Sequence, residues 1–112
     1  MPKPLSRAYS HYSTAALLAF SQLIRRARIE RRLTTQELAD RAGISRGLLQ
    51  RIEKGDPGCA IGIVFEVAAI LGLRLFDADQ ATLAASVSAN KAILTLLPKS
   101  IRLSSTQVKD DF

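Results

Sequence analysis

The 112-residue sequence has one cysteine, one histidine and no tryptophan, and each scarcity narrows what the chain can do. A single cysteine, Cys59, excludes a disulfide within the chain and leaves no cysteine cluster for a metal. The single histidine, His11, lies in a segment that we expect to be a flexible arm. Asp77 and Asp79 are a weak metal candidate, because two carboxylates without further ligands are more often helix caps. With no phosphate-binding glycine loop either, we expect no enzyme, no catalytic residue, no metal and no cofactor.

Aromatic residues make up only 5% of the chain, so Leu, Ile, Ala and Val must form most of its core. That mixture favours helices over strands. Long apolar runs are also missing. The run near the N-terminus, residues 15–20, is too short to cross a bilayer, and the main arginine cluster follows it instead of preceding it as in a signal peptide. We therefore expect a cytoplasmic, all-α protein with a single core.

The positive charge is concentrated in one half of the chain. Residues 1–54 carry eleven Lys and Arg against four acidic residues, a net charge of +7, whereas residues 55–112 carry five against six, a net charge of −1. A positive field confined to one half suggests a polyanionic partner, most simply nucleic acid. A basic surface that only faces water is the alternative, and charge alone does not decide between the two.

The chain begins with an expected arm and a long helix. Residues 1–12 show no sustained periodicity and are predicted to be a flexible arm. Ser13 or Thr14 is expected to cap a helix that runs to about Arg32. Apolar residues at three- and four-residue steps give this helix one inward stripe. The stripe consists of Leu17, Phe20, Ile24 and Ala27.

The next segment has the signals of two short helices joined by a tight turn. Thr34 and Glu37 have capping-box spacing, which predicts a second helix over about 35–42. Gly43 then accepts left-handed backbone, and Ser45 caps a third helix that ends at Gly55. The residues expected inside are Leu38, Ala39 and Ala42 from the second helix, and Leu49 and Ile52, with Leu48 nearby, from the third.

Two further helices and a tail follow. A helix over about 60–71 is expected to end at Gly72 and to bury Ile61, Val64, Phe65, Ala68 and Leu71. Residues 78–97 read as a fifth helix, rich in Ala and Leu and poor in charge, which Pro98 ends. The tail, residues 98–112, alternates weakly, so a short strand, a docking peptide and disorder all remain open.

The fifth helix carries more apolar surface than one small domain readily buries. We predict that residues 77–97 mediate homodimerisation, since two-fold dimers match palindromic operators with half-sites about one DNA turn apart. An ordinary core helix is the alternative. The apolar residues concerned are Leu83, Val87, Ile93, Leu94, Leu96 and Leu97.

The middle of the chain has the spacing of a helix-turn-helix. Ala39 is small where the next helix crosses close above it, and Gly43 permits positive φ at the bend. The wedge between the helices is filled by Ile44, Leu49 and Ile52. This arrangement leaves the N-terminal half of the third helix protruding, and an α-helix fits a major groove about 12 Å wide.

Residues 36–55 read Q-E-L-A-D-R-A-G-I-S-R-G-L-L-Q-R-I-E-K-G. This motif resembles the helix-turn-helix family of the phage repressors and their bacterial relatives, over about residues 20–75. The resemblance implies a five-helix DNA-binding domain, which we place at residues 13–76, with a helical and partly extended C-terminal extension. It also implies that Arg28 pairs with Glu53 and ties the first helix to the third.

The same resemblance implies which residues contact double-stranded DNA. Thr35 and Gln36 correspond to phosphate contacts, whereas Ser45, Arg46, Gly47 and Leu48 open the recognition helix, where base edges are read. Gln50 and Arg51 lie a turn further on and reach a base or phosphate. Independently of the resemblance, an arginine such as Arg46 can bind guanine O6 and N7 together, for about 1–3 kcal/mol of discrimination. Arginines that only face solvent are the alternative.

A narrower resemblance concerns residues 53–73, E-K-G-D-P-G-C-A-I-G-I-V-F-E-V-A-A-I-L-G-L, together with L-P-K-S-I-R and V-K-D-D-F in the tail. These segments are similar to antitoxins (HipB-like) that pair with HipA-type serine/threonine kinase toxins. Such a protein is expected to repress its own operon as a dimer and to hold the kinase inactive. The tail itself suggests a docking segment for the kinase, because its apolar terminus after Asp110 and Asp111 could enter a pocket. A stand-alone phage-repressor-type regulator without a toxin partner is the alternative.

Overall fold

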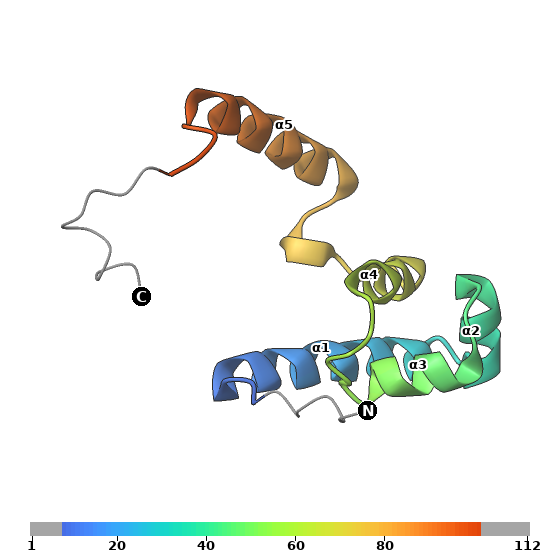
Figure 1. Cartoon of the computed structure of the whole chain (residues 1–112). Helices are drawn as coiled ribbons and strands as arrows, with labels where there is room; N and C mark the ends of the chain where they lie inside the picture. Colours follow the sequence, from blue (N-terminus) through green and yellow to red (C-terminus); the bar gives the residue numbers. More distant parts are fainter. Residues whose placement is uncertain (1–7, 102–112) are drawn as a thin grey trace. The chain divides into compact units, whose positions relative to one another are not determined.

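The computed structural model describes residues 8–101, and the chain divides after Asp77 into two compact units. The described residues form five α-helices and one short 3-10 helix, and none of them forms a strand (Figure 1). The expectation of an all-α protein is therefore confirmed. The helices of the first unit are α1 (His11–Glu30), α2 (Thr35–Ala42), α3 (Arg46–Glu53) and α4 (Ile61–Ile70), followed by the 3-10 helix η1 (Leu75–Asp77).

Four helices of the first unit enclose one small core. In Figure 1 α3 lies beside α1, α2 closes one end, and α4 is seen nearly end-on. Each of the four helices contributes at least two fully or almost fully buried residues. The short helices α2, α3 and α4 depend on this burial, because isolated helices of 8 to 10 residues are marginal in water. The buried apolar residues are Ile24, Ala27, Leu38, Ala39, Leu49, Ile52, Val67, Ala68 and Leu71.

Helix α1 differs from its prediction at the N-terminal end. Ser10, not Ser13 or Thr14, is the N-cap, and its hydroxyl accepts the amide of Ser13 at 3.1 Å. The helix therefore begins at His11, inside the segment predicted as a flexible arm. The cause is local, because a serine in extended backbone with a free hydroxyl acceptor starts a helix wherever the following residues can continue it.

Helix α4 differs in its buried face. The prediction that Ile61 lies inside was wrong, because its side chain is 68% exposed, whereas Val67 is fully buried. Val64 and Phe65 are half-buried, and the rings of Phe20 and Phe65 meet edge-to-face with centroids 6.4 Å apart. Nearly every residue of α4 is apolar, so its sequence contained no polar face to define the buried one.

The turn between α2 and α3 has the expected construction. Thr34 and Glu37 form the capping box, with the Thr34 amide donating to the Glu37 carboxylate at 2.8 Å and the Glu37 amide donating to the Thr34 hydroxyl at 3.0 Å. Gly43 ends α2 at φ 68°. The Ile44 amide then donates to the carbonyl of Ala39 at 3.0 Å, and the Ser45 hydroxyl caps α3. These bonds fix the angle between the two helices.

The second unit, as far as it is described, is the helix α5 (Gln80–Leu96) and the short segment after it. Asp79 caps the helix by accepting the Thr82 amide at 2.8 Å. None of the residues of α5 is buried. Of the predicted tail, residues 98–101 are non-helical and residues 102–112 lie outside the described residues. In the described part of the chain, no helix is long and apolar enough to cross a membrane.

Candidate nucleic-acid interface

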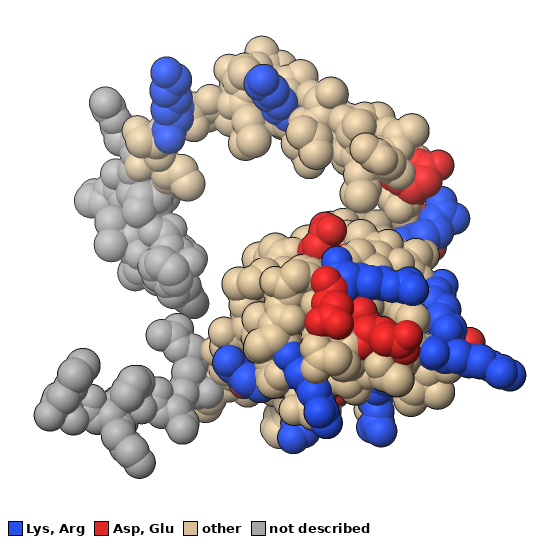
Figure 2. Space-filling view, turned by 90° about the vertical axis from the view of Figure 1, so that its right-hand side faces the viewer, with Lys and Arg blue, Asp and Glu red and all other residues tan. Residues whose placement is uncertain are grey.

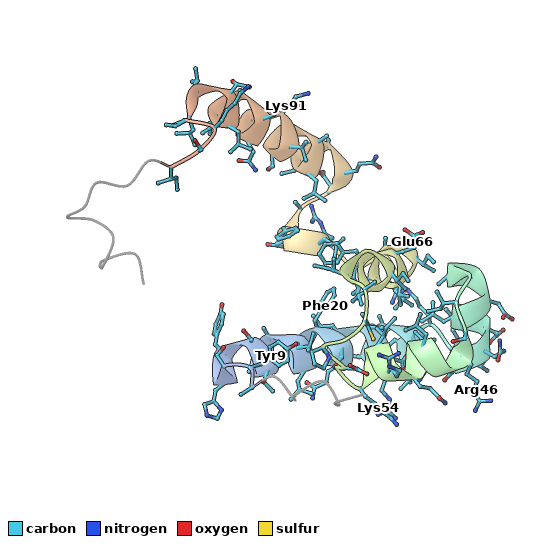
Figure 3. All side chains as sticks on the ribbon, in the orientation of Figure 1. Tyr9, Phe20, Arg46, Lys54, Glu66 and Lys91 are labelled. Atoms are coloured by element: carbon cyan, nitrogen blue, oxygen red, sulfur yellow. The ribbon has the colours of Figure 1, made fainter. Side chains whose placement is uncertain are left out.

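The first half of α3 presents an open surface. Ser45, Arg46 and Gly47 are all exposed, and so is Gln50 one turn further along. Figure 3 shows Arg46 pointing away from the domain. A Cβ built on Gly47 would meet no atom within 4 Å, so nothing in the domain covers this face. A ligand can therefore approach α3 at Gly47 until it meets the helix backbone.

Leu48 lies differently from the other residues expected at the DNA. Its side chain is partly buried and packs against the core. Its backbone amide donates to the Ser45 hydroxyl at 3.0 Å, so it also belongs to the cap of α3. An amphipathic helix places residues three and four apart on the same side, which puts Leu48 nearer to the buried Leu49 and Ile52 than to the exposed face.

Arg51 is engaged within the domain. Its Nε donates to Oδ2 of Asp56 at 2.8 Å, and Oδ1 of Asp56 accepts the amide of Gly58 at 2.8 Å. The Arg51 hydrogen bond, with a smaller contribution from the Gly58 amide, lowers the pKa of Asp56 below its ordinary value. The Arg51 side chain is still 53% exposed. The loop after α3 therefore orients this guanidinium and leaves part of it accessible.

Arg28 and Glu53 form a largely buried ion pair between α1 and α3. Arg28 Nε donates to Glu53 Oε2 at 2.7 Å and Nη2 donates to Oε1 at 3.1 Å, so the pair is bidentate. A third bond runs from Nη1 to the carbonyl of Leu33 at 2.9 Å. The side chains are only 12% and 9% exposed. This pair joins the end of α3 to α1 and to the turn before α2, which sets the position of α3.

A polar hollow at this ion pair adds two residues, Arg25 and Lys54, that the sequence motif did not single out. It is lined by Arg25, Arg28, Thr35, Gln50, Glu53 and Lys54. Because Arg28 neutralises Glu53, the charges of Arg25 and Lys54 are left in excess. Figure 2 shows Lys and Arg side chains around the lower and right edges of the domain, and Figure 3 shows Lys54 pointing outward on the same side of α3 as Arg46.

The first turn of α2 lies at the same hollow. The capping box occupies the amides of Thr34 and Glu37, whereas the amides of Thr35 and Gln36 have no acceptor among residues 8–101. Free amides at a helix N-terminus attract anions. Gln36 itself is exposed and donates to Asp40 at 2.8 Å. Sequence spacing could have suggested Lys54 from its place directly after the recognition helix, but Arg25 comes from another helix and is found only in three dimensions.

The remaining chemically reactive residues lie elsewhere. Cys59 is partly buried, and burial is the main cause that raises the pKa of its thiol. His11 is exposed in the first turn of α1. Within residues 8–101, no three His, Cys, Asp or Glu side chains come together as a possible metal site. Asp79 serves as the N-cap of α5, as described above.

Comparison with known proteins finds one family that resembles the middle of the chain. Residues 24–77 match the family model described as Helix-turn-helix. No curated protein and no solved structure matches the chain. The matched range contains α2, the Gly43 turn and α3, which carry most of the exposed surface described above, together with α4. Over residues 24–77 the chain is therefore similar to the helix-turn-helix family, and this similarity supports a DNA-binding transcriptional regulator.

Proposed function

We propose that the protein is a sequence-specific transcriptional repressor that binds a palindromic DNA operator as a homodimer. The observation that carries this proposal is the uncovered first half of α3, where Arg46 and Gly47 face outward with no part of the domain above them. A recognition helix must enter the major groove with these positions leading. The net positive charge of residues 1–54 supplies the sequence-independent attraction to DNA.

Base reading is assigned mainly to Arg46. Its guanidinium binds guanine O6 and N7 together, whereas Gly47 has no side chain to read with and instead lets the backbone come close to the bases. Gln50 is exposed one turn further along and reaches a base or a phosphate. Arg51 is held by Asp56, and its two terminal nitrogens remain to contact the DNA.

Phosphate binding is assigned to the polar hollow. Thr35 lines the hollow and, with its neighbour Gln36, offers free amides at the start of α2, while Arg25 and Lys54 supply two positive charges in the hollow. Charge-assisted bonds of this kind position a protein on the duplex without reading sequence. Each neutralised phosphate releases counterions, so the affinity depends steeply on salt.

A gel-shift titration with the DNA upstream of the protein's own gene, beside a random-sequence duplex, tests this assignment. Arg46→Ala should weaken binding to the specific site by about 1–3 kcal/mol and change binding to random DNA little. Lys54→Ala should weaken binding to both and reduce the salt slope by about 1. Arg26→Ala is the control, since it removes one exposed charge from α1 away from the hollow. Binding like the parent by all three variants would refute the assignment.

We further propose that the repressor is the antitoxin of a type II toxin–antitoxin system and neutralises a HipA-type kinase. Support comes from the similarity of residues 53–73 and of the tail to such antitoxins. The test is co-expression with the kinase-like protein encoded beside its gene, followed by co-purification. Deletion of residues 98–112 should abolish capture of the kinase and leave DNA binding intact. If no kinase gene lies beside it, or the full chain captures none, the protein is a stand-alone regulator.

A further inference from the structure

We propose that α5 pairs with α5 of a second copy of this chain through one apolar stripe, which we call the α5 seam. The seam consists of Leu83, Val87, Asn90, Leu94 and Leu97. The inference deepens the proposed function, because it assigns the homodimer contact to a particular face of one helix. Of the apolar residues of this helix that the sequence suggested for dimerisation, Ile93 and Leu96 fall outside the stripe and are not part of the proposed contact.

The spacing of the seam is that of a helix–helix interface. Its residues follow one another at steps of four, three, four and three, the pattern that keeps one face of a helix toward a partner helix. Val87 and Leu94 are each 66% exposed and Leu97 is 52% exposed. This face is therefore apolar and largely uncovered.

The surface of α5 already contains a socket for a partner side chain. A hollow on it is lined by Val87, Asn90, Lys91 and Leu94, together with Thr95 and Lys99. The first four stand at steps of three, one and three residues, the four-residue hole that receives one side chain of a facing helix in knobs-into-holes packing. Seam residues of an identical helix supply knobs of the right size, such as Leu94 itself.

Two features select a second copy over an unrelated partner. Asn90 is the middle residue of the seam, so in a parallel two-fold pair with the helices in register each Asn90 faces the other. The two side-chain amides can then donate to and accept from each other. Lys91 is the one charged residue of α5. The helix therefore has no pattern of alternating charges of the kind that selects a different protein as partner. Figure 3 marks Lys91 on this helix.

Asn90 is inferred to be the residue that sets the number and register of the paired helices. An asparagine in an otherwise apolar seam costs stability and restricts the assembly, because any misaligned or higher-order packing buries its amide against apolar side chains. Asn90→Leu should therefore tighten association and add species larger than a dimer.

The far side of α5 provides a matched control. At 100° per residue, Leu96 lies on the opposite face from Leu94, next to the small residues Ala85 and Ala92. Leu96 is 85% exposed. Leu94→Glu and Leu96→Glu thus make the same chemical change two positions apart on one helix, and only the first falls in the seam.

The test is sedimentation of the full chain without DNA. The parent should be a dimer. Leu94→Glu should raise the dimer dissociation constant by about 100-fold or more, because it removes a buried leucine from both copies. Leu96→Glu should leave the constant within about threefold. A monomeric parent, or equal effects of the two variants, would overturn the proposal.

Cysteine crosslinking supplies a second measurement that does not depend on a disruptive variant. With Cys59→Ala as background, Asn90→Cys should form an intermolecular disulfide on mild oxidation, and Ala92→Cys should not. Equal crosslinking at both positions would also overturn the proposal. The proposed function can fail independently of this proposal. If the chain dimerises through the seam but binds no DNA, the α5 seam is supported and the repressor function is refuted.

Discussion

Helix α2 is 8 residues long and buries two of them completely, whereas α5 is 17 residues long and buries none. The shorter helix is also the more polar one. Its stability comes from a capping box at one end, a glycine at the other and the core beneath it, because tertiary packing and not helix propensity stabilises most protein helices. Helix α5 has good helix formers and an N-cap but no core. The comparison teaches that apolar content alone does not say whether a helix is inside a domain or available to a partner.

Breaking the buried ion pair of the first unit should give the largest loss of stability. Helix α5 has no buried residue and therefore no such pair. Arg28→Ala leaves the Glu53 carboxylate buried without its cation and should lower the free energy of unfolding by about 3–5 kcal/mol. Chemical denaturation followed by circular dichroism measures it. Arg26→Ala breaks an exposed pair on the same helix and should cost at most about 0.5 kcal/mol. Similar losses in the two variants would contradict the buried environment of Arg28.

Truncating one leucine in the first unit and one in α5 compares how much each side chain contributes to stability. Leu38 is fully buried in the domain, so Leu38→Ala should cost about 2–5 kcal/mol through lost burial and the cavity left behind. Leu96→Ala removes the same atoms from an exposed face of α5 and should cost less than about 0.5 kcal/mol. Urea unfolding of both variants provides the values. A substantial loss at Leu96 would mean that this face is covered in the native protein.

Two glycines of the recognition region should respond with opposite signs. Gly43 ends α2 with positive φ, so Gly43→Ala should destabilise the domain by about 1–2 kcal/mol although space for the methyl group exists. Gly47 is inside α3 with ordinary helical backbone, and Gly47→Ala should stabilise by about 0.5–1 kcal/mol. Thermal melts give the sign of each change. The same Gly47→Ala protein should bind DNA more weakly if the backbone approaches the bases there.

The smallest expected effect is the response of the two acidic caps to pH. Hydrogen bonds from Thr82 lower the pKa of Asp79, and those with Thr34 lower the pKa of Glu37. A lowered folded-state pKa stabilises each cap above the ordinary carboxyl pKa, and this contribution is lost as the pH falls through the lowered value. Acid should therefore fray α5 at its start, whereas the core should hold α2 in place.

The pH response can be followed through the amide resonances of Thr82 and Glu37 in NMR spectra between about pH 5 and pH 2. Asp79→Asn supplies the control, since a neutral asparagine still caps a helix, and it should abolish the pH response at Thr82 only. Equal fraying of α2 and α5 in acid would contradict the view that only one of them rests on a core.

The helix-turn-helix itself could be predicted in detail because its signals are local. Thr34, Glu37, Gly43 and Ser45 each act on amides or backbone angles within four residues, so their roles follow from spacing alone. The start of α1 was missed because several neighbouring hydroxyl residues could all have capped it, and only Ser10 does. The buried face of α4 was missed because a helix apolar on all sides contains no pattern to read.

The surroundings of the recognition helix needed three-dimensional information. Arg51 was expected to reach a base or phosphate, and the motif gave no sign of its bond to Asp56, which closes a loop after α3. The polar hollow joins Arg25 of α1 to Thr35 of α2 and Lys54 after α3, residues that are distant along the chain. Their nearness depends on how α1 and α3 pack, which the Arg28–Glu53 pair controls.

For this protein the amino-acid order alone determined the all-helical class, the limits of α2 and α3, and the turn at Gly43, since caps and glycine angles are interactions between near neighbours. Only the tertiary structure decided which charges share one surface, which arginine is tied back, and which face of α4 is buried. These depend on the packing of helices against one another, and packing brings together residues whose separation in sequence carries no signal.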